Sequence, residues 1–127
     1  MPASSVAVLG ASRDRRKFGN KAVRAYLRSG WKVFPVNPNE SKIEGLAAFP
    51  TVEAIGEPVD VVSFYVPPAV GVTLLPGLAA KRPRELWLNP GAESDELLSA
   101  AEALHLRTVV GCSIVALGHS PQAFPDE

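Results

Sequence analysis

The sequence contains one cysteine and no long apolar run, and these two scarcities narrow the possible classes of protein. A single cysteine, Cys112, can form neither a disulfide within the chain nor a cysteine-based metal cluster. No stretch approaches the ~20 apolar residues that a membrane-spanning helix needs. The first residues show no charged segment followed by an apolar run, which a signal peptide would have. We therefore expect a cytoplasmic protein that holds no metal and does not enter a membrane.

A net charge is also missing, because 13 Lys and Arg residues balance 13 Asp and Glu residues. Proteins that hold nucleic acid or anionic lipid by general electrostatic attraction usually carry a basic excess, so neither is an expected partner. The balance is uneven along the chain, however. One segment has a single acid, Asp14, among eight basic residues, which are Arg13, Arg15, Arg16, Lys17, Lys21, Arg24, Arg28 and Lys32. This local surplus is either an anion-binding region or a solvated helix face.

The remaining composition is typical of one soluble globular domain. The chain has 127 residues, of which 46% are hydrophobic and 20% are charged. We expect a single domain over residues 1–127, with residues 119–127 forming a loosely ordered tail.

Short apolar runs alternate along the chain with longer amphipathic segments. The runs predict five strands, at residues 5–10, 31–37, 59–66, 85–88 and 107–111, and the segments between them predict helices at 19–29, 51–55, 67–81 and 94–106. Nearly continuous apolar strands indicate burial on both faces, which is typical of a parallel sheet. We therefore predict a Rossmann-like, doubly wound α/β fold with strand order 3-2-1-4-5. Pro76 is expected to kink or end the third helix.

The loop after the first strand is the expected ligand site, since such sheets bind ligands at the carboxyl ends of their strands. Gly10 allows a sharp turn off the strand, and the small residues Ala11 and Ser12 leave backbone amides accessible. The next helix offers its positive end to an anion, and Arg13 and Lys17 add two cations. This pattern predicts a site for phosphate groups.

The usual dinucleotide fingerprint is not met, because Ser12 and Arg15 stand where its second and third glycines would be. The second predicted strand ends at Asn37 and Pro38, without the acid that would bind the ribose hydroxyls of NAD. Lys42 follows instead, and a lysine there suits a ribose phosphate. The residues favour coenzyme A, with its 3′-phosphate, or NADP.

The ordered set of motifs resembles the CoA-binding domain family, whose Rossmann-like module also begins the succinyl-CoA synthetase alpha subunit and ADP-forming acyl-CoA synthetases. The matching segments cover nearly the whole chain and are VAVLGASRD (6–14), GWKVFPVNPN (30–39), residues 45–51, PVDVVSFYVPP (58–68), ELWLNPGA (85–92) and VVGCSI (109–114). Each motif is weak alone, and the ordered set is specific.

The resemblance implies a coenzyme A site along these segments. The residues implied for the pyrophosphate are Gly10, Ala11, Ser12, Arg13 and Lys17. Those implied for the adenosine, its 3′-phosphate and the wall beside them are Asn37, Pro38, Lys42, Val66 and Pro67. Those implied for the pantetheine arm are Asn89, Pro90 and Gly91. The alternatives are that the prolines only stiffen loops and that Val66 packs in the core.

The resemblance does not bring a catalytic group with it. The synthetases use a phosphorylated histidine on a further domain, whereas His105 and His119 lie here on a helix and in the tail with no acid placed to orient them. Cys112 follows the fifth strand and could exchange disulfides with coenzyme A, although a small buried core residue is the favoured interpretation. We expect a protein that binds coenzyme A or an acyl-CoA and is non-catalytic on its own. The alternatives are a small NADP-linked reductase and a CoA-site subunit acting with a separate ligase partner.

Overall fold

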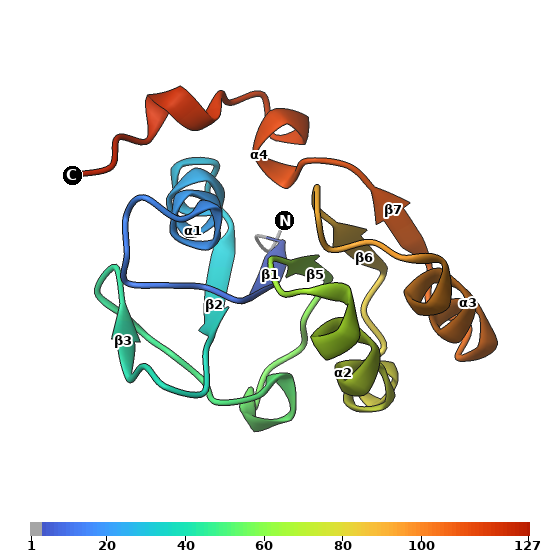
Figure 1. Ribbon diagram of the computed structural model, residues 1–127. Coiled ribbons are helices and arrows are strands. Elements are labelled where there is room, and N and C mark those ends of the chain that lie inside the picture. The colour runs from blue at the N-terminus through green and yellow to red at the C-terminus, as the bar shows by residue number, and fades with distance from the viewer. Residues whose placement is uncertain (1–3) are drawn as a thin grey trace.

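Five parallel strands form the central sheet of the computed structural model, which describes residues 4–127 (Figure 1). They are β1 (Ser5–Leu9), β2 (Lys32–Val36), β5 (Val61–Phe64), β6 (Glu85–Leu88) and β7 (Thr108–Val110). Each lies within a stretch that the sequence predicts as a strand. The predicted Rossmann-like α/β fold with a five-stranded parallel sheet is confirmed.

The order of the strands differs from the predicted order. The sheet runs β2-β1-β5-β6-β7, so the third predicted strand lies beside the first, and the predicted order 3-2-1-4-5 is wrong. Residues Val6 to Leu9 of β1 pair with Val61 to Phe64 of β5. Pro35 explains why β2 lies at the edge of this sheet, because proline has no N–H to donate to a further strand. The direction of winding therefore changes between β1 and β5, and that is where such folds bind ligands.

Helices cover both faces of the sheet in two layers (Figure 1). One face carries α1 (Phe18–Arg28) and α4 (Ser113–Ala116), which contact each other. The opposite face carries α2 (Pro68–Lys81), α3 (Asp95–Ala103) and the 3₁₀ turn η1 (Val52–Ala54). The predicted early end of the third helix at Pro76 is wrong, since α2 continues through this exposed proline to Lys81.

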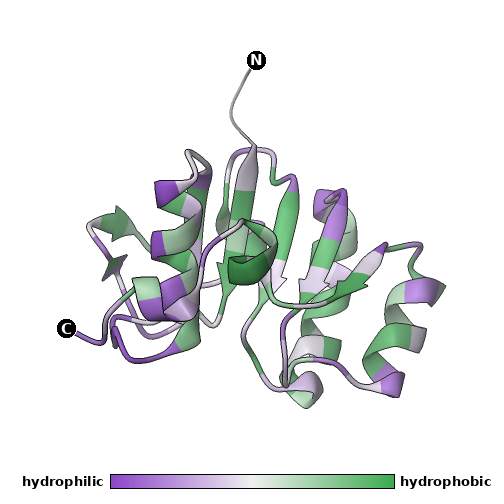
Figure 2. Ribbon diagram, turned by 90° about the horizontal axis from the view of Figure 1, so that it is seen from above, coloured by the Kyte–Doolittle hydropathy of each residue, from purple (hydrophilic) through white to green (hydrophobic). Residues whose placement is uncertain are grey.

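Each face of the sheet has its own apolar core. Successive side chains of a strand point to opposite faces, so Val6 and Val8 of β1 pack toward α1 while Ala7 and Leu9 pack toward α2 and α3. All four side chains are at most 2% exposed. Figure 2 shows the hydrophobic strands, with hydrophilic residues on the outer sides of α1 and α3. This double burial explains the nearly continuous apolar runs in the sequence.

Two further features were absent from the prediction. A small antiparallel hairpin, β3 (Lys42–Ile43) with β4 (Leu46–Ala47), follows β2 and lies outside the main sheet. The segment after Gly118, expected to be loose, instead forms the 3₁₀ turn η2 (Pro121–Ala123) and packs against α1.

A buried aromatic ring holds this last segment in place. Phe124 is 1% exposed, and the Arg28 guanidinium of α1 lies 4.4 Å from the centre of its ring. Asp126 adds an ion pair of 2.8 Å to Lys21. Phe124 is the one large apolar residue of an otherwise polar segment, so the sequence did not indicate that the segment packs.

Candidate functional site

A cleft of about 290 Å³ opens at the carboxyl ends of β1, β2 and β5. Four of the predicted site residues line it together, namely Gly10, Asn37, Pro38 and Val66. The opposite wall comes from η1 and from the apolar side of α2. The cleft has mainly apolar walls at the point where the strand order reverses, which suits a flat aromatic group such as a nucleobase.

The turn out of β1 is packed too closely for any residue except glycine. Gly10 has φ +81°, and a Cβ atom added to it would lie 2.4 Å from the carbonyl oxygen of Tyr65 at the end of β5. A Cβ atom added to Gly19, in the first turn of α1, would lie 2.2 Å from the carbonyl oxygen of Gly10. These approaches bring the loop between β1 and α1 directly onto the sheet edge.

Side-chain amides hold the carbonyl groups of this loop. Asn37 donates from Nδ2 to the carbonyl oxygen of Ala11 at 2.8 Å, and Asn20 donates to that of Ser12 at 2.8 Å. Within residues 4–127, the backbone amides of Ala11, Ser12 and Arg13 have no hydrogen-bond acceptor. Ala11 is fully buried, contrary to the expectation of an accessible amide, whereas Ser12 is half-buried and Arg13 is exposed. The amides of Ser12 and Arg13 are therefore the available donors to an anion.

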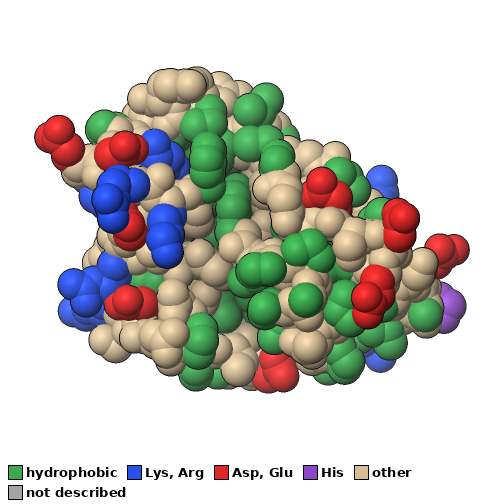
Figure 3. All heavy atoms as spheres, viewed as in Figure 1, with side chains coloured by type: hydrophobic (Ala, Val, Ile, Leu, Met, Phe, Trp, Pro, Cys, Tyr) green, Lys and Arg blue, Asp and Glu red, His purple; other side chains and the backbone are tan. Residues whose placement is uncertain are grey.

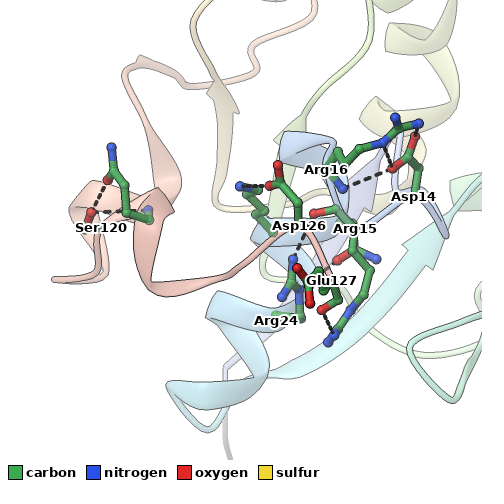
Figure 4. A network of polar contacts seen from close by, with 10 residues as sticks. Asp14, Arg15, Arg16, Arg24, Ser120, Asp126 and Glu127 are labelled. Carbon is green, nitrogen blue, oxygen red and sulfur yellow. Dashed lines mark hydrogen bonds and ion pairs between the residues drawn. The ribbon is translucent and has the colours of Figure 1, made fainter.

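Glu44 holds the same loop from the turn of the β3–β4 hairpin. Its side chain is 19% exposed, and it accepts two hydrogen bonds from Arg15, at 3.0 and 3.2 Å, and one from Asn20 at 3.0 Å. Arg24 completes the cluster by donating to Asn20 Oδ1. It also donates to the Arg15 carbonyl, and Figure 4 shows the two arginines side by side. Burial alone would raise the pKa of Glu44, but the hydrogen bonds from Asn20 and Arg15 outweigh it and lower that pKa.

Acids neutralise most of the basic surplus that the sequence shows near α1. Five of its eight members have acidic partners, in the pairs Arg13–Glu40, Arg15–Glu44, Arg16–Asp14, Lys21–Asp126 and Lys32–Glu57. Figure 3 shows the blue and red side chains interleaved on the side of α1 and β3. Hydrogen bonds from Arg16 lower the pKa of Asp14 to about 2.

Lys17 differs from these paired residues. It stands immediately before α1 and has no acidic partner within residues 4–127. Lys17 therefore keeps its charge available at the positive end of the helix, as the sequence predicts for a phosphate ligand.

A second hollow, of about 280 Å³, continues the cleft along the sheet edge. Pro67, Pro90 and Gly91 line it together with Tyr65 and Val66. Val66 lines both hollows and also packs against the core beneath them. The pantetheine residues implied by the resemblance, apart from Asn89, thus share one surface with the nucleotide residues.

Asn89 has a different role from the predicted one. Its side chain is buried, donates to Ser63 Oγ and the Phe64 carbonyl at 2.9 Å each, and accepts from the Ser113 amide at 2.8 Å. These bonds tie the end of β6 to β5 and to α4. The backbone after Asn89 leads into the second hollow, while its side chain is occupied by the fold.

None of the three predicted cations, Arg13, Lys17 and Lys42, lines the cleft itself, and Lys42 is the one on the hairpin side. It lies exposed on β3, at the turn that follows Asn37 and Pro38. A ligand phosphate would have to extend from the cleft toward the hairpin to meet it.

The remaining candidate residues lie apart from the main cleft. His105 is exposed, and His119 contacts Ser29 and the Phe124 ring. Half-buried Cys112 lines a small hollow of about 120 Å³ with Phe18, and disulfide exchange at Cys112 stays a prediction.

The described residues also allow a search for metal sites and membrane spans. Residues 4–127 contain no group of three or more His, Cys, Asp or Glu side chains that could hold a metal ion. None of their helices combines the length and the hydrophobicity needed to cross a bilayer.

Comparison with known proteins identifies the family. The family described as "CoA binding domain" matches residues 4–118. The chain belongs to the CoA binding domain family. A segment of 63 residues is 38% identical to the acetate–CoA ligase (ADP-forming) II subunit alpha of Pyrococcus furiosus. This segment is 49% of the chain and only 14% of that subunit, so the chain matches a small part of the curated relative.

Solved structures share the fold over most of the chain. A conserved hypothetical protein from Pyrococcus furiosus has a TM-score of 0.82 and 35% identity, covering 89% of this chain and 98% of its own. The Thermus thermophilus protein cell-free ID.343 has a TM-score of 0.83 and 30% identity, over 89% and 87%. The dinucleotide-forming acetyl-coenzyme A synthetase 1 of Ca. Korarchaeum cryptofilum has a TM-score of 0.74 and 28% identity, over 84% of this chain and 25% of its own.

The Glu44 cluster generates a prediction about pH. Replacing Glu44 with Gln should lower the free energy of unfolding at pH 7 by about 2 kcal/mol, because Arg15 and Asn20 lose a charged acceptor. Since the folded pKa is lowered, the contribution of Glu44 is full above its unfolded pKa, near ~4.3, and is lost as the pH falls through the folded value. Urea unfolding between pH 2 and pH 7 measures this, with exposed Glu102→Gln as the control. Parallel pH profiles for the wild type and Glu44→Gln would contradict it.

Proposed function

We propose that this protein binds coenzyme A or an acyl-CoA and that it is non-catalytic on its own. The observation that carries the proposal is the β1–α1 turn, where the amides of Ser12 and Arg13, unpaired within residues 4–127, lie beside an apolar cleft at the reversal of strand order. Membership of the CoA binding domain family supports the choice of ligand. The fold would supply a rigid surface, and the ligand would lie across the ends of the strands.

The diphosphate belongs at the start of α1. Backbone amides of Ser12 and Arg13 would donate to its oxygens, as oriented amides do in phosphate-binding loops. Lys17 adds a charge that forms no ion pair within residues 4–127. Arg13 is 73% exposed and only 3.6 Å from Glu40, so it can exchange this weak surface pair for a phosphate.

The two ends of the ligand extend from this point in opposite directions. The adenosine would occupy the main cleft, between Pro38 and Val66. The 3′-phosphate would then extend toward Lys42 on the hairpin. The pantetheine arm would cross Val66 into the second hollow, along Pro67 and Pro90.

A second candidate function is a CoA-site subunit that acts with a separate ligase partner. The similarity to a protein named as a ligase subunit favours it, because such a subunit shares its activity with other chains. An NADP-linked reductase is the third candidate, and it would use the same phosphate loop. Both the binding protein and the CoA-site subunit should bind coenzyme A without other proteins, whereas the reductase should prefer NADP.

The 3′-phosphate separates the candidate ligands. Coenzyme A should raise the melting temperature more than dephospho-coenzyme A or NADP does, because Lys42 pairs with the phosphate on the 3′ oxygen. Replacing Lys42 with Ala should remove the difference between coenzyme A and its dephospho form. Thermal shifts of the wild type and Lys42→Ala with coenzyme A and with dephospho-coenzyme A measure this, and NADP is added to the wild type. Equal shifts by both ligands in the wild type would remove Lys42 from the site, and a larger shift by NADP would favour the reductase.

The diphosphate cations can be tested separately. Arg13→Ala should weaken coenzyme A binding by ~1.5–3 kcal/mol, and Lys17→Ala by ~1–2 kcal/mol, because each cation loses its phosphate partner. Isothermal titration measures both. Lys32→Ala is the matched control. Lys32 begins β2, at the amino ends of the strands and away from the cleft, and it pairs with Glu57. Unchanged affinity in both test variants would contradict this role and would favour the alternative that the basic segment is a solvated helix face.

A further inference from the structure

Two polar groups that the binding proposal does not use lie in the wall of the main cleft. Glu53 lies in η1 and Thr51 caps the start of this turn. The third polar side chain of the cleft, Asn37, is already occupied, because it donates to the Ala11 carbonyl and accepts from the Asn39 amide. Thr51 and Glu53 are therefore the side chains that remain to recognise a polar edge of a ligand in this cleft.

The two groups offer complementary hydrogen bonding. The carboxylate of Glu53 has no hydrogen-bond or ion-pair partner within residues 4–127, and it is an acceptor only. The Thr51 hydroxyl accepts from the Ala54 amide at 3.3 Å and keeps its own hydrogen as a donor. An acceptor and a donor therefore stand two residues apart on one short turn.

A notch in α2 fixes the position of the Glu53 carboxylate. A Cβ atom added to Gly77 would lie 2.4–2.7 Å from the three carboxyl atoms of Glu53. The carboxylate thus lies against the bare backbone of α2, a space that any larger residue at this position would take. Leu74 and Leu78, on either side of Gly77, line the cleft itself. The notch places the acceptor at the rim of the apolar wall.

We infer that Glu53, aided by Thr51, selects adenine in this cleft by accepting a hydrogen bond from its 6-amino group. Adenine presents an amino donor beside a ring-nitrogen acceptor, which matches the Glu53 acceptor and the Thr51 donor. A 6-oxopurine presents a carbonyl oxygen at the same position, and that oxygen would face the carboxylate with no proton between them. The inference rests on the proposed function, since it assumes that coenzyme A brings the base to this cleft.

The test compares coenzyme A with its hypoxanthine analogue, which differs only by a 6-oxo group in place of the 6-amino group. Titration calorimetry of the full chain should show that the wild type binds coenzyme A roughly tenfold more tightly than the analogue. Glu53→Ala should bind the two ligands within about twofold of each other, because the acceptor is gone. Glu102→Ala, on exposed α3, is the matched control and should keep the wild-type preference.

The outcomes separate the inference from the proposed function. If the wild type binds neither ligand, the proposed function fails and the inference fails with it. If both ligands bind the wild type equally, or if Glu53→Ala keeps the full preference, the proposed function stands and the inference is overturned. Thermal unfolding of Glu53→Ala without ligand should match that of the wild type, because this side chain is exposed and unpaired within residues 4–127.

Discussion

The rest of the site depends on the close backbone contact between the β1–α1 turn and the end of β5. Because Gly10 and Gly19 have no side chains, the backbone of the turn reaches the Tyr65 carbonyl and then doubles back onto its own helix. The turn can reach that carbonyl because β5 pairs directly with β1. This approach carries the Ser12 and Arg13 amides and the cleft to the same edge of the sheet. A larger residue at either position would push them apart.

Ion pairs between the cations near α1 and surrounding acids also stabilise the β1–α1 loop. Five of the eight cations near α1 pair with acids, three of them with Glu40, Glu44 and Asp126. Glu44 has the largest structural part in this, since it joins the β3–β4 hairpin to the loop through Arg15 and buried Asn20. The network holds the loop in one conformation before any ligand arrives. Lys17 remains as a local charge, which fits a phosphate site better than a broad basic surface does.

The sequence alone predicted most of the fold, because buried parallel strands and amphipathic helices leave clear periodicities. It predicted the wrong strand order, because periodicity says nothing about which side of β1 the third strand takes. Pro35 was a usable signal that β2 lies at the edge of the sheet. The packed tail escaped prediction, since one buried ring, Phe124, holds an otherwise polar segment.

The candidate site was predictable where it depends on the backbone and not where it depends on distant side chains. Gly10, Asn37, Pro38 and Val66 do share one cleft, and the motifs placed them there. The Asn89 side chain does not reach a hollow, because it is hydrogen-bonded to Ser63 and to the Ser113 amide. These contacts join distant segments, so the sequence gives no sign of them. Glu44 and Glu53 passed unnoticed, because each lies on a short element with no sequence signature. Their positions follow from long-range packing against α1 and α2.

Amide spectra of the labelled protein during a titration with coenzyme A test the central claim most directly. The account predicts that the backbone amides of Ser12 and Arg13 shift strongly to lower field and saturate together, because each gains a charged acceptor. Saturable binding that leaves these two amides unmoved would contradict it.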